Sequence, residues 1–154
     1  MHTYDLVCIT ETWLSASIFD AELTCGKYQI VRSDRDLRGC NKKGGGGSLA
    51  LISNSFSSTP IDYSFPAPIN VSISKVTISS SFSFYLVVAY FPPKPTAALF
   101  ESFFQFFYDQ PIFLSSNLII LGDFNLPEVT GSDFSFETGS ALARQFSDFI
   151  LCFN

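Results

Sequence analysis

One stretch of sequence decides the fold: NLIILGDFNLP, residues 117–127. Residues 118–121 form an apolar run of strand length, and Gly122 begins a sharp turn that contains Asp123 and Asn125. In α/β folds, functional side chains gather where strands end along one edge of a sheet. The stretch therefore predicts a buried strand followed by a turn with two candidate site residues.

Two earlier strand ends carry polar side chains of related chemistry. An apolar run ending at Thr10 leads into Glu11, and a longer one carries Tyr90 just before a Pro-Pro pair stops it. If the three strand ends lie side by side, these two side chains meet Asp123 and Asn125. Two carboxylates with an amide and a phenol form a hard-oxygen site suited to Mg²⁺ and a phosphate group. Taken singly, each of these residues is also an ordinary polar residue after a strand.

The periodicity of the remaining chain predicts a mixed sheet with helices packed on it. The expected strands cover residues 5–10, 28–32, 48–52, 71–78, 82–91 and 117–122, with a β-bulge near Ser74-Lys75. Residues 53–68 are rich in Ser and Pro and are expected to form a loop or a ragged edge. A helix over residues 96–108 has Thr96 as its N-cap, and Leu142, Phe146, Phe149 and Ile150 mark a second helix. No internal repeat or linker divides residues 1–154, so a single α/β domain is expected.

Composition excludes several classes of protein. With 47% hydrophobic and 15% charged residues the chain is not intrinsically disordered. No apolar run reaches the roughly 18 residues of a membrane span, and no signal peptide pattern begins the chain. We therefore expect no membrane partner and a nuclear or cytoplasmic protein that is not secreted, in which the sequon at Asn70 carries no meaning. The four Cys lack the paired spacing of a zinc site, so free thiols are expected.

Positive charge is concentrated in one segment of an otherwise acidic chain. The net charge is −5, yet six of the nine Lys and Arg residues lie between positions 27 and 43. This segment runs into the four glycines Gly44–Gly47, which favour a loop. A basic loop on an acidic body is typical of a phosphate-contacting loop beside a metal-binding cleft, and we expect residues 32–43 to touch a DNA backbone. An ordinary solvated loop has the same composition.

Four motifs, taken in order, resemble the endonuclease/exonuclease/phosphatase family. The match is to the apurinic-endonuclease-like domain of non-LTR (LINE-type) retrotransposon polyproteins, and it extends over essentially the whole chain. The Gly-Asp-Phe-Asn turn is the most specific of the motifs, and the glycine run is the least specific. The motifs are Ile9-Thr10-Glu11-Thr12-Trp13-Leu14, Arg32-Ser33-Asp34-Arg35 with Gly44–Gly47, Tyr90-Phe91-Pro92-Pro93, and Gly122-Asp123-Phe124-Asn125-Leu126-Pro127.

This resemblance implies a fold, a reaction and roles for individual residues. The fold would be a DNase-I-like four-layer α/β sandwich with mixed sheets. The reaction would be DNA cleavage dependent on Mg²⁺, with Mn²⁺ as the alternative ion, which leaves a 3′-hydroxyl to prime a reverse transcriptase in the same polyprotein. Glu11 matches the metal-binding glutamate and Asp123 the aspartate that orients or deprotonates the attacking water. Asn125 matches the asparagine that holds the scissile phosphate, and Tyr90 a tyrosine near that phosphate.

The resemblance also implies that the sandwich is incomplete. The family uses an asparagine on a strand before the glutamate-bearing strand. It also uses a Ser-Asp-His motif near the C-terminus of the domain, whose histidine is essential. The only histidine here, His2, cannot replace a histidine on a late strand. We therefore expect a single partial domain over residues 1–154 that cleaves DNA poorly by itself. The alternatives are a non-catalytic remnant, or a phosphatase or phosphodiesterase of the same family.

Overall fold

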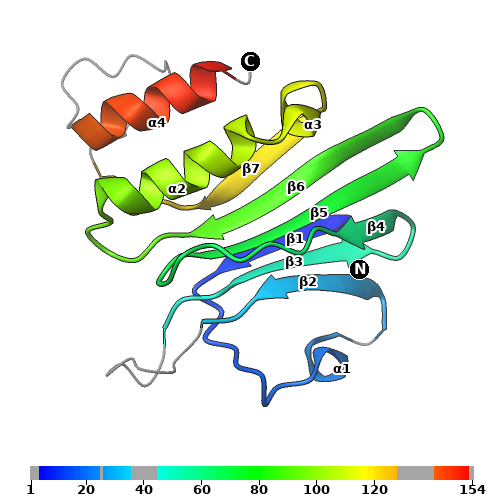
Figure 1. Ribbon diagram of the computed structural model, residues 1–154. Helices are drawn as coiled ribbons and strands as arrows, with labels where there is room; N and C mark the ends of the chain where they lie inside the picture. The colour runs from blue at the N-terminus through cyan, green and yellow to red at the C-terminus, as the bar shows by residue number, and fades with distance from the viewer. Residues whose placement is uncertain (1–3, 25, 36–44, 128–140, 153–154) are drawn as a thin grey trace.

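Two β-sheets packed face to face form the centre of the computed structural model, which describes residues 4–24, 26–35, 45–127 and 141–152 (Figure 1). The first sheet is antiparallel and has the strand order β1-β3-β2. Its strands are β1 (Leu6–Thr10), β2 (Tyr28–Ser33) and β3 (Ser48–Ser53). The second sheet has the order β4-β5-β6-β7, in which only the β6-β7 pair is parallel. Its strands are β4 (Ser57–Pro60), β5 (Asn70–Ser79), β6 (Phe82–Tyr90) and β7 (Leu118–Asp123).

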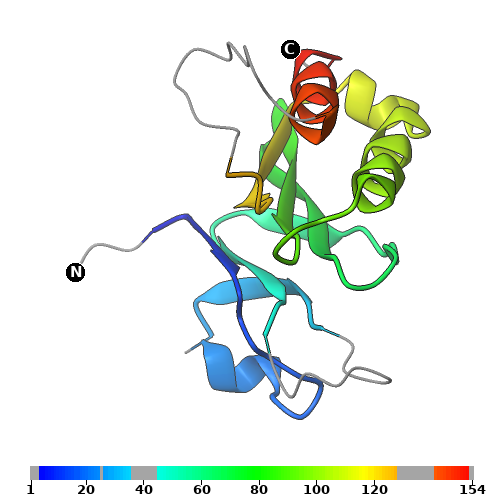
Figure 2. The ribbon, with the colours of Figure 1, turned by 90° about the vertical axis from the view of Figure 1, so that its left-hand side faces the viewer.

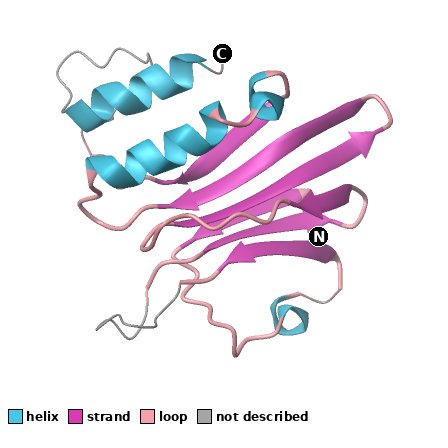
Figure 3. Ribbon diagram, in the orientation of Figure 1, coloured by secondary structure: helices cyan, strands magenta, loops and turns pink. Residues whose placement is uncertain are grey.

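Helices lie on the outer faces of this pair of sheets. The long helices α2 (Ala97–Tyr108) and α4 (Ala141–Cys152) lie side by side over the second sheet, with the short α3 (Pro111–Leu114) beside them (Figure 1, Figure 3). The four-residue α1 (Asp20–Leu23) lies on the far side of the first sheet (Figure 2). The mixed α/β class with two sheets is thus confirmed. None of the helices in the described part of the chain is long and apolar enough to cross a membrane.

Strand β6 is apolar from Phe84 onward, where it is buried on both faces. Tyr85, Val87 and Ala89 pack under the helices in a core that is dominated by phenylalanines of α2. Phe84 and Leu86 point the other way, into the layer between the two sheets. An unbroken apolar run is the expected pattern for a strand that is covered on both sides. This strand therefore connects the two cores and fixes the position of its C-terminal end.

Two local expectations, for the β-bulge and for the N-cap, differ from the structure, and the one for residues 53–68 is met by an edge strand. The β5-β6 register runs regularly past Ser74-Lys75, and its irregularity lies between Thr77 and Ser79. The apparent slip in the sequence arises because the apolar residues of β5 change from the helix-facing core to the layer between the sheets. Strand β4 lies within the stretch 53–68 that was expected to be a loop or a ragged edge, and it forms the outer edge of the second sheet. Thr96 is the N-cap of α2, but its side chain makes no capping hydrogen bond.

Candidate active site

Three polar side chains form one row across the second sheet. Asn70 is the register partner of Tyr90, and Tyr90 is the register partner of Asp123. The neighbours of all three residues in sequence pack toward the helices, so side-chain alternation directs the row toward the first sheet. Asn70 and Tyr90 are buried, and Asp123 is half-buried. An amide, a phenol and a carboxylate are thereby held at the same edge by three strands.

Glu11 reaches this edge from the first sheet. It directly follows β1 and adopts a left-handed backbone conformation, with φ of 56°. Its Oε2 atom accepts hydrogen bonds from the backbone N–H of Gly46 at 2.7 Å and from the indole Nε1 of Trp13 at 2.8 Å. The hydroxyl of Tyr90 also hydrogen-bonds the Glu11 carboxylate. The two sheets therefore meet through Glu11 and Tyr90.

The surroundings of Glu11 favour its charged form. Partial desolvation by itself raises the pKa of this carboxyl, but hydrogen bonds from Tyr90, Gly46 and Trp13 and the positive charge of Arg35 together lower the pKa below its usual value. The opposite holds for the phenol. Burial, and then the hydrogen bond to Glu11 and its charge, raise the pKa of Tyr90 to about 12. The pair is thus a carboxylate with a protonated phenol at neutral pH.

The glycine loop before β3 braces this arrangement. Gly46 and Gly47 have φ of 77° and 95°, a region that L-residues with side chains rarely adopt. Their successive N–H groups donate to Glu11 and to the side-chain oxygen of Asn70, the latter at 3.0 Å. A Cβ on Gly46 would lie 3.0 to 3.2 Å from atoms of Asn70, Arg35 and Tyr90. The loop therefore fits only because it has no side chains.

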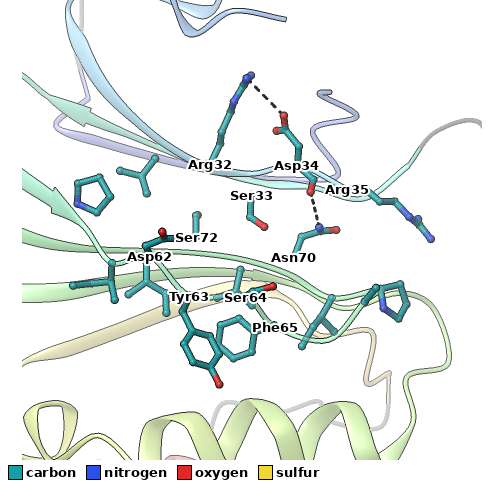
Figure 4. A pocket seen from close by; sticks show the side chains of 18 residues that line it. Arg32, Ser33, Asp34, Arg35, Asp62, Tyr63, Ser64, Phe65, Asn70 and Ser72 are labelled. Atoms are coloured by element: carbon teal, nitrogen blue, oxygen red, sulfur yellow. Dashed lines mark hydrogen bonds and ion pairs between the residues drawn. The ribbon is translucent and has the colours of Figure 1, made fainter. Parts of the chain in front are cut away.

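Asn70 is a site residue that the sequence reasoning missed. Its amide nitrogen donates to the backbone oxygen of Asp34 at 3.2 Å (Figure 4), while its oxygen accepts from the backbone N–H of Gly47. It thereby joins the start of β5 to both ends of the connection between β2 and β3. In the sequence it appeared only as part of a glycosylation sequon. A polar residue that begins a strand at the same edge as Tyr90 was the available signal, but it required the β5-β6 register.

The turn after β7 places the last two predicted residues. The Asp123 carboxylate accepts from the backbone N–H of Asn125 at 3.0 Å, and the Asn125 side-chain amide donates to the Phe91 carbonyl at 2.7 Å. Asn125 has φ of 50°, which the tight turn requires. An amide nitrogen carries two hydrogens, so one remains for another acceptor. Residues 122–127, together with Phe146 of α4, line a pocket of about 430 Å³ here.

The structure thus brings Glu11, Tyr90 and Asp123 to one edge, with Asn125 beside Asp123. Asp123 is close enough to act electrostatically on the Tyr90 phenol. These four residues come from three separate segments of the chain, since Asp123 and Asn125 share one turn. Their placement is a property of the fold, and their roles in catalysis stay predictions.

Two arginines of the basic segment lie in the described part of the chain, and they differ in their contacts. Arg32 is bound within the protein, and Arg35 faces the site. Arg32 pairs with Asp20 at 3.1 Å, donates to the carbonyl of Ile18 at 2.7 Å and lies 3.6 Å from Asp34 (Figure 4). It fastens the segment before α1 to β2 and is not free for a DNA backbone. The expected contacts of Arg38, Lys42 and Lys43 lie outside the described residues.

Arg35 is the cation that remains at the site. Its side chain lies against Gly46 and acts on both Glu11 and Tyr90 electrostatically. Within the described ranges it forms no ion pair. Figure 4 shows it pointing away from Arg32 at the end of a pocket of about 600 Å³ that lies between β2 and residues 60–73. Its position suits contact with an anion at the same edge.

The oxygen atoms at this edge fit a divalent ion that also contacts a phosphate. Among the described residues, no three His, Cys, Asp or Glu side chains group into a ready-made metal centre. Mg²⁺ is commonly held by only one or two carboxylates and by substrate phosphates. Glu11, ionised and exposed, and Asp123 across Tyr90 provide such a pair. The donor set therefore suits Mg²⁺ in the presence of its substrate better than alone.

Solved structures share the fold of this chain. The catalytic domain of human Nocturnin, solved with a bound sulfate anion, is similar with a TM-score of 0.59 at 16% sequence identity, over 81% of this chain and 52% of that one. A truncated Caenorhabditis elegans TDP2 gives a TM-score of 0.47 at 16% identity, over 79% of this chain and 49% of that one. The chain thus spans about half the length of these solved structures.

Sequence comparison is more specific. Among curated protein sequences, none matches this chain. A family model, that of the Endonuclease/Exonuclease/phosphatase family, matches residues 1–152. This match includes all four candidate residues and nearly the whole chain. The chain therefore belongs to the endonuclease/exonuclease/phosphatase family.

Proposed function

We propose that this chain forms part of a Mg²⁺-dependent endonuclease that cleaves phosphodiester bonds in DNA. The observation that carries the proposal is the Glu11 carboxylate, kept ionised by three hydrogen-bond donors at the edge where Tyr90 and Asp123 also end. An anionic substrate needs a cation at such an edge, because bare carboxylates repel it. Glu11 and Asp123 would hold that ion, and Mn²⁺ has the same ligand preference for oxygen.

Each site residue has a chemical task under this proposal. Glu11 and Asp123 would hold Mg²⁺, which would supply positive charge to the phosphate and to the leaving oxygen. Asp123 orients a water molecule toward the phosphorus and accepts its proton. Tyr90, with a pKa raised to about 12, stays protonated, and its one hydroxyl hydrogen would turn from Glu11 to a phosphate oxygen when the substrate binds. Asn125 offers its remaining N–H to another oxygen, and Arg35 adds positive charge beside Glu11.

The finer assignment is to the non-LTR retrotransposon branch, with a reverse transcriptase in the same polyprotein as partner. It is supported by the Glu-Thr-Trp-Leu word at Glu11 and by the glycine loop, which folds onto that glutamate. The bound sulfate named for the Nocturnin structure supports an anion site on this fold, since sulfate has the shape of phosphate. We propose further that residues 1–154 alone cleave DNA slowly, since they span about half of that structure.

The test is Mg²⁺-dependent nicking of supercoiled plasmid by this chain and by a longer polypeptide from the same reading frame. We expect slow nicking by the chain, faster nicking by the longer form, and loss of both with Glu11→Gln. Glu101→Gln on the exposed face of α2 is the matched control and should leave the rate unchanged. Release of phosphate from a small phosphomonoester without any nicking would identify a phosphatase and overturn the proposal.

A further inference from the structure

Trp13 is fixed at the site by both its backbone and its side chain. Its backbone N–H donates to the carbonyl of Gly46 at 3.0 Å, and its indole Nε1 donates to Glu11 Oε2 at 2.8 Å. Its φ is 57°, so two nearby residues, Glu11 and Trp13, adopt the left-handed conformation. Non-glycine residues adopt that conformation rarely, and the surrounding structure has to hold them in it. The ring is therefore held in one orientation relative to the carboxylate.

The same ring is 70% exposed to solvent. Trp is the largest apolar side chain, and this is the single Trp in the chain. The hydrogen bond to Glu11 uses the N–H on the edge of the indole, so it does not occupy the faces of the ring. A rigid aromatic face is thus presented to solvent beside the residue that we expect to hold the metal ion. A role confined to holding Glu11 explains the N–H contact but not this exposure.

We propose that Trp13 is a stacking surface for a nucleobase that flanks the phosphate bound at Glu11. This inference rests on the proposed function and adds to it the class of substrate. Every nucleobase has a flat aromatic face, and stacking on an exposed aromatic residue is the usual way in which proteins hold unpaired bases. A base inside a duplex has both faces covered by its neighbours. The favoured substrate is therefore a nucleotide whose base is unpaired or displaced from the helix.

The charges around Trp13 agree with this ligand. Arg35 lies beside Glu11 at the glycine loop, since both side chains would be within 4 Å of a Cβ on Gly45. Arg35 can therefore contact the backbone phosphate, while Glu11 would hold the ion that the phosphate binds. Phosphate and base are then bound by different side chains a short distance apart. Binding of the phosphate depends on Glu11, and binding of the base depends on the Trp13 ring, so the two contributions can be separated by experiment.

The experiment uses two pentanucleotides with the same phosphate backbone in the presence of Mg²⁺. One carries five thymines, and the other carries tetrahydrofuran abasic residues in place of every nucleotide. Binding of fluorescently labelled pentamers is followed by anisotropy, and the intrinsic fluorescence of Trp13 is recorded with unlabelled ones. We expect the thymine pentamer to quench Trp13 and to bind about tenfold more tightly than the abasic pentamer, the factor that one stacked base typically contributes.

Two variants and one matched control complete the test. Both Trp13→Phe and Trp13→Leu lose the N–H bond to Glu11, so any weakening of phosphate binding is common to the two variants. Trp13→Phe keeps an aromatic face and should retain most of the preference for the thymine pentamer over the abasic one, whereas Trp13→Leu should abolish that preference. Phe19→Leu, at an equally exposed aromatic residue outside the site, should leave that preference unchanged. Mg²⁺-dependent binding of both pentamers with equal affinity and without quenching would overturn this inference but leave the proposed function standing. Absence of Mg²⁺-dependent binding for both pentamers would overturn both.

Discussion

Asn70 and Tyr90 are register partners on β5 and β6, and both lie against the place where a side chain on Gly46 would be. The amide of Asn70 holds the loop through Gly47 and the phenol of Tyr90 holds Glu11, which accepts from Gly46. One pair of residues on the second sheet thereby sets the position of the glycine loop on the first. Glu11, the candidate metal ligand that follows a strand of the first sheet, is therefore held in place by residues of the second sheet.

Asn70→Ala should loosen this connection. The variant leaves the Gly47 N–H and the Asp34 carbonyl without their partner, and an unpaired buried polar group costs about 1–3 kcal/mol. We expect a loss of that size in the free energy of unfolding, measured by urea denaturation. Asn54→Ala is the matched control, because Asn54 makes one exposed hydrogen bond of 2.8 Å to Gly26 and should cost no more than about 0.5 kcal/mol. Equal losses in the two variants would contradict the role of Asn70.

Gly46→Ala should damage both stability and the site. Gly26→Ala is an unusually close control, since Gly26 has a similar φ of 72° but no atom within 4 Å of an added Cβ. Both variants carry the cost of a left-handed L-residue, about 1–2 kcal/mol. Only Gly46→Ala also pushes on Asn70 and Tyr90, which should add roughly 1–3 kcal/mol. Thermal unfolding monitored by circular dichroism measures the difference, and equal melting temperatures would refute the close packing.

Tyr90→Phe should raise the pKa of Glu11. The phenol contributes a hydrogen bond that stabilises the charged carboxylate, so its removal favours the protonated form. The measurement is a carbon-13 NMR titration of the Glu11 carboxyl in both proteins. Tyr28→Phe removes a hydrogen bond of 2.9 Å to the carbonyl of Tyr4 on the first sheet and should leave the Glu11 titration unchanged. A Glu11 titration in Tyr90→Phe that matches the parent protein would show that the phenol does not stabilise the carboxylate.

The stability contributed by ionised Glu11 should depend on pH in one direction. Its pKa in the folded protein lies below the ordinary value of 4.5, so the unfolded chain takes up a proton first as the pH falls. The contribution is therefore fully present above about pH 4.5 and is lost as the pH falls through the folded pKa. The difference in unfolding free energy between the parent protein and Glu11→Gln should be constant from pH 5.5 to 7, and should shrink below pH 4.5. A difference that grows in acid would show the opposite sign of shift.

Much of the fold followed from local patterns in the sequence. The apolar run of β6 is a strong strand signal because most of that strand is covered on both faces. The run before Asp123 correctly predicted a strand but not its burial, because β7 lies at the edge of the second sheet and exposes Ile119 and Leu121. The α2 helix was predictable from phenylalanines repeated along one face. Strand β4 could not be recognised as a strand, because its sequence of serines, a threonine and a proline has neither an apolar run nor an alternation of apolar and polar residues.

The candidate site was predictable only where its residues sit in motifs. Glu11, Tyr90, Asp123 and Asn125 each follow or end a strand, so topology alone suggested them. Asn70 became visible only through its pairing with Tyr90, which depends on a register between distant parts of the chain. Arg32 was expected to face a DNA backbone, but its partner Asp20 lies in a short helix that has no clear sequence signal. Such pairings are set by tertiary structure and leave no local pattern.

The layer between the sheets has a consequence for the distance between the two carboxylates. Glu11 follows a strand of the first sheet and Asp123 ends a strand of the second, so no backbone hydrogen bond sets their separation directly. Near them that layer is occupied by the small buried side chains of Ser48 and Ser72, while Phe84 and Leu86 fill it farther along. Two hydroxyl-sized side chains thus lie between the sheets on this side of the molecule. Exchanging either serine for a larger residue would push the sheets apart and change the separation of the two carboxylates, without altering either carboxylate.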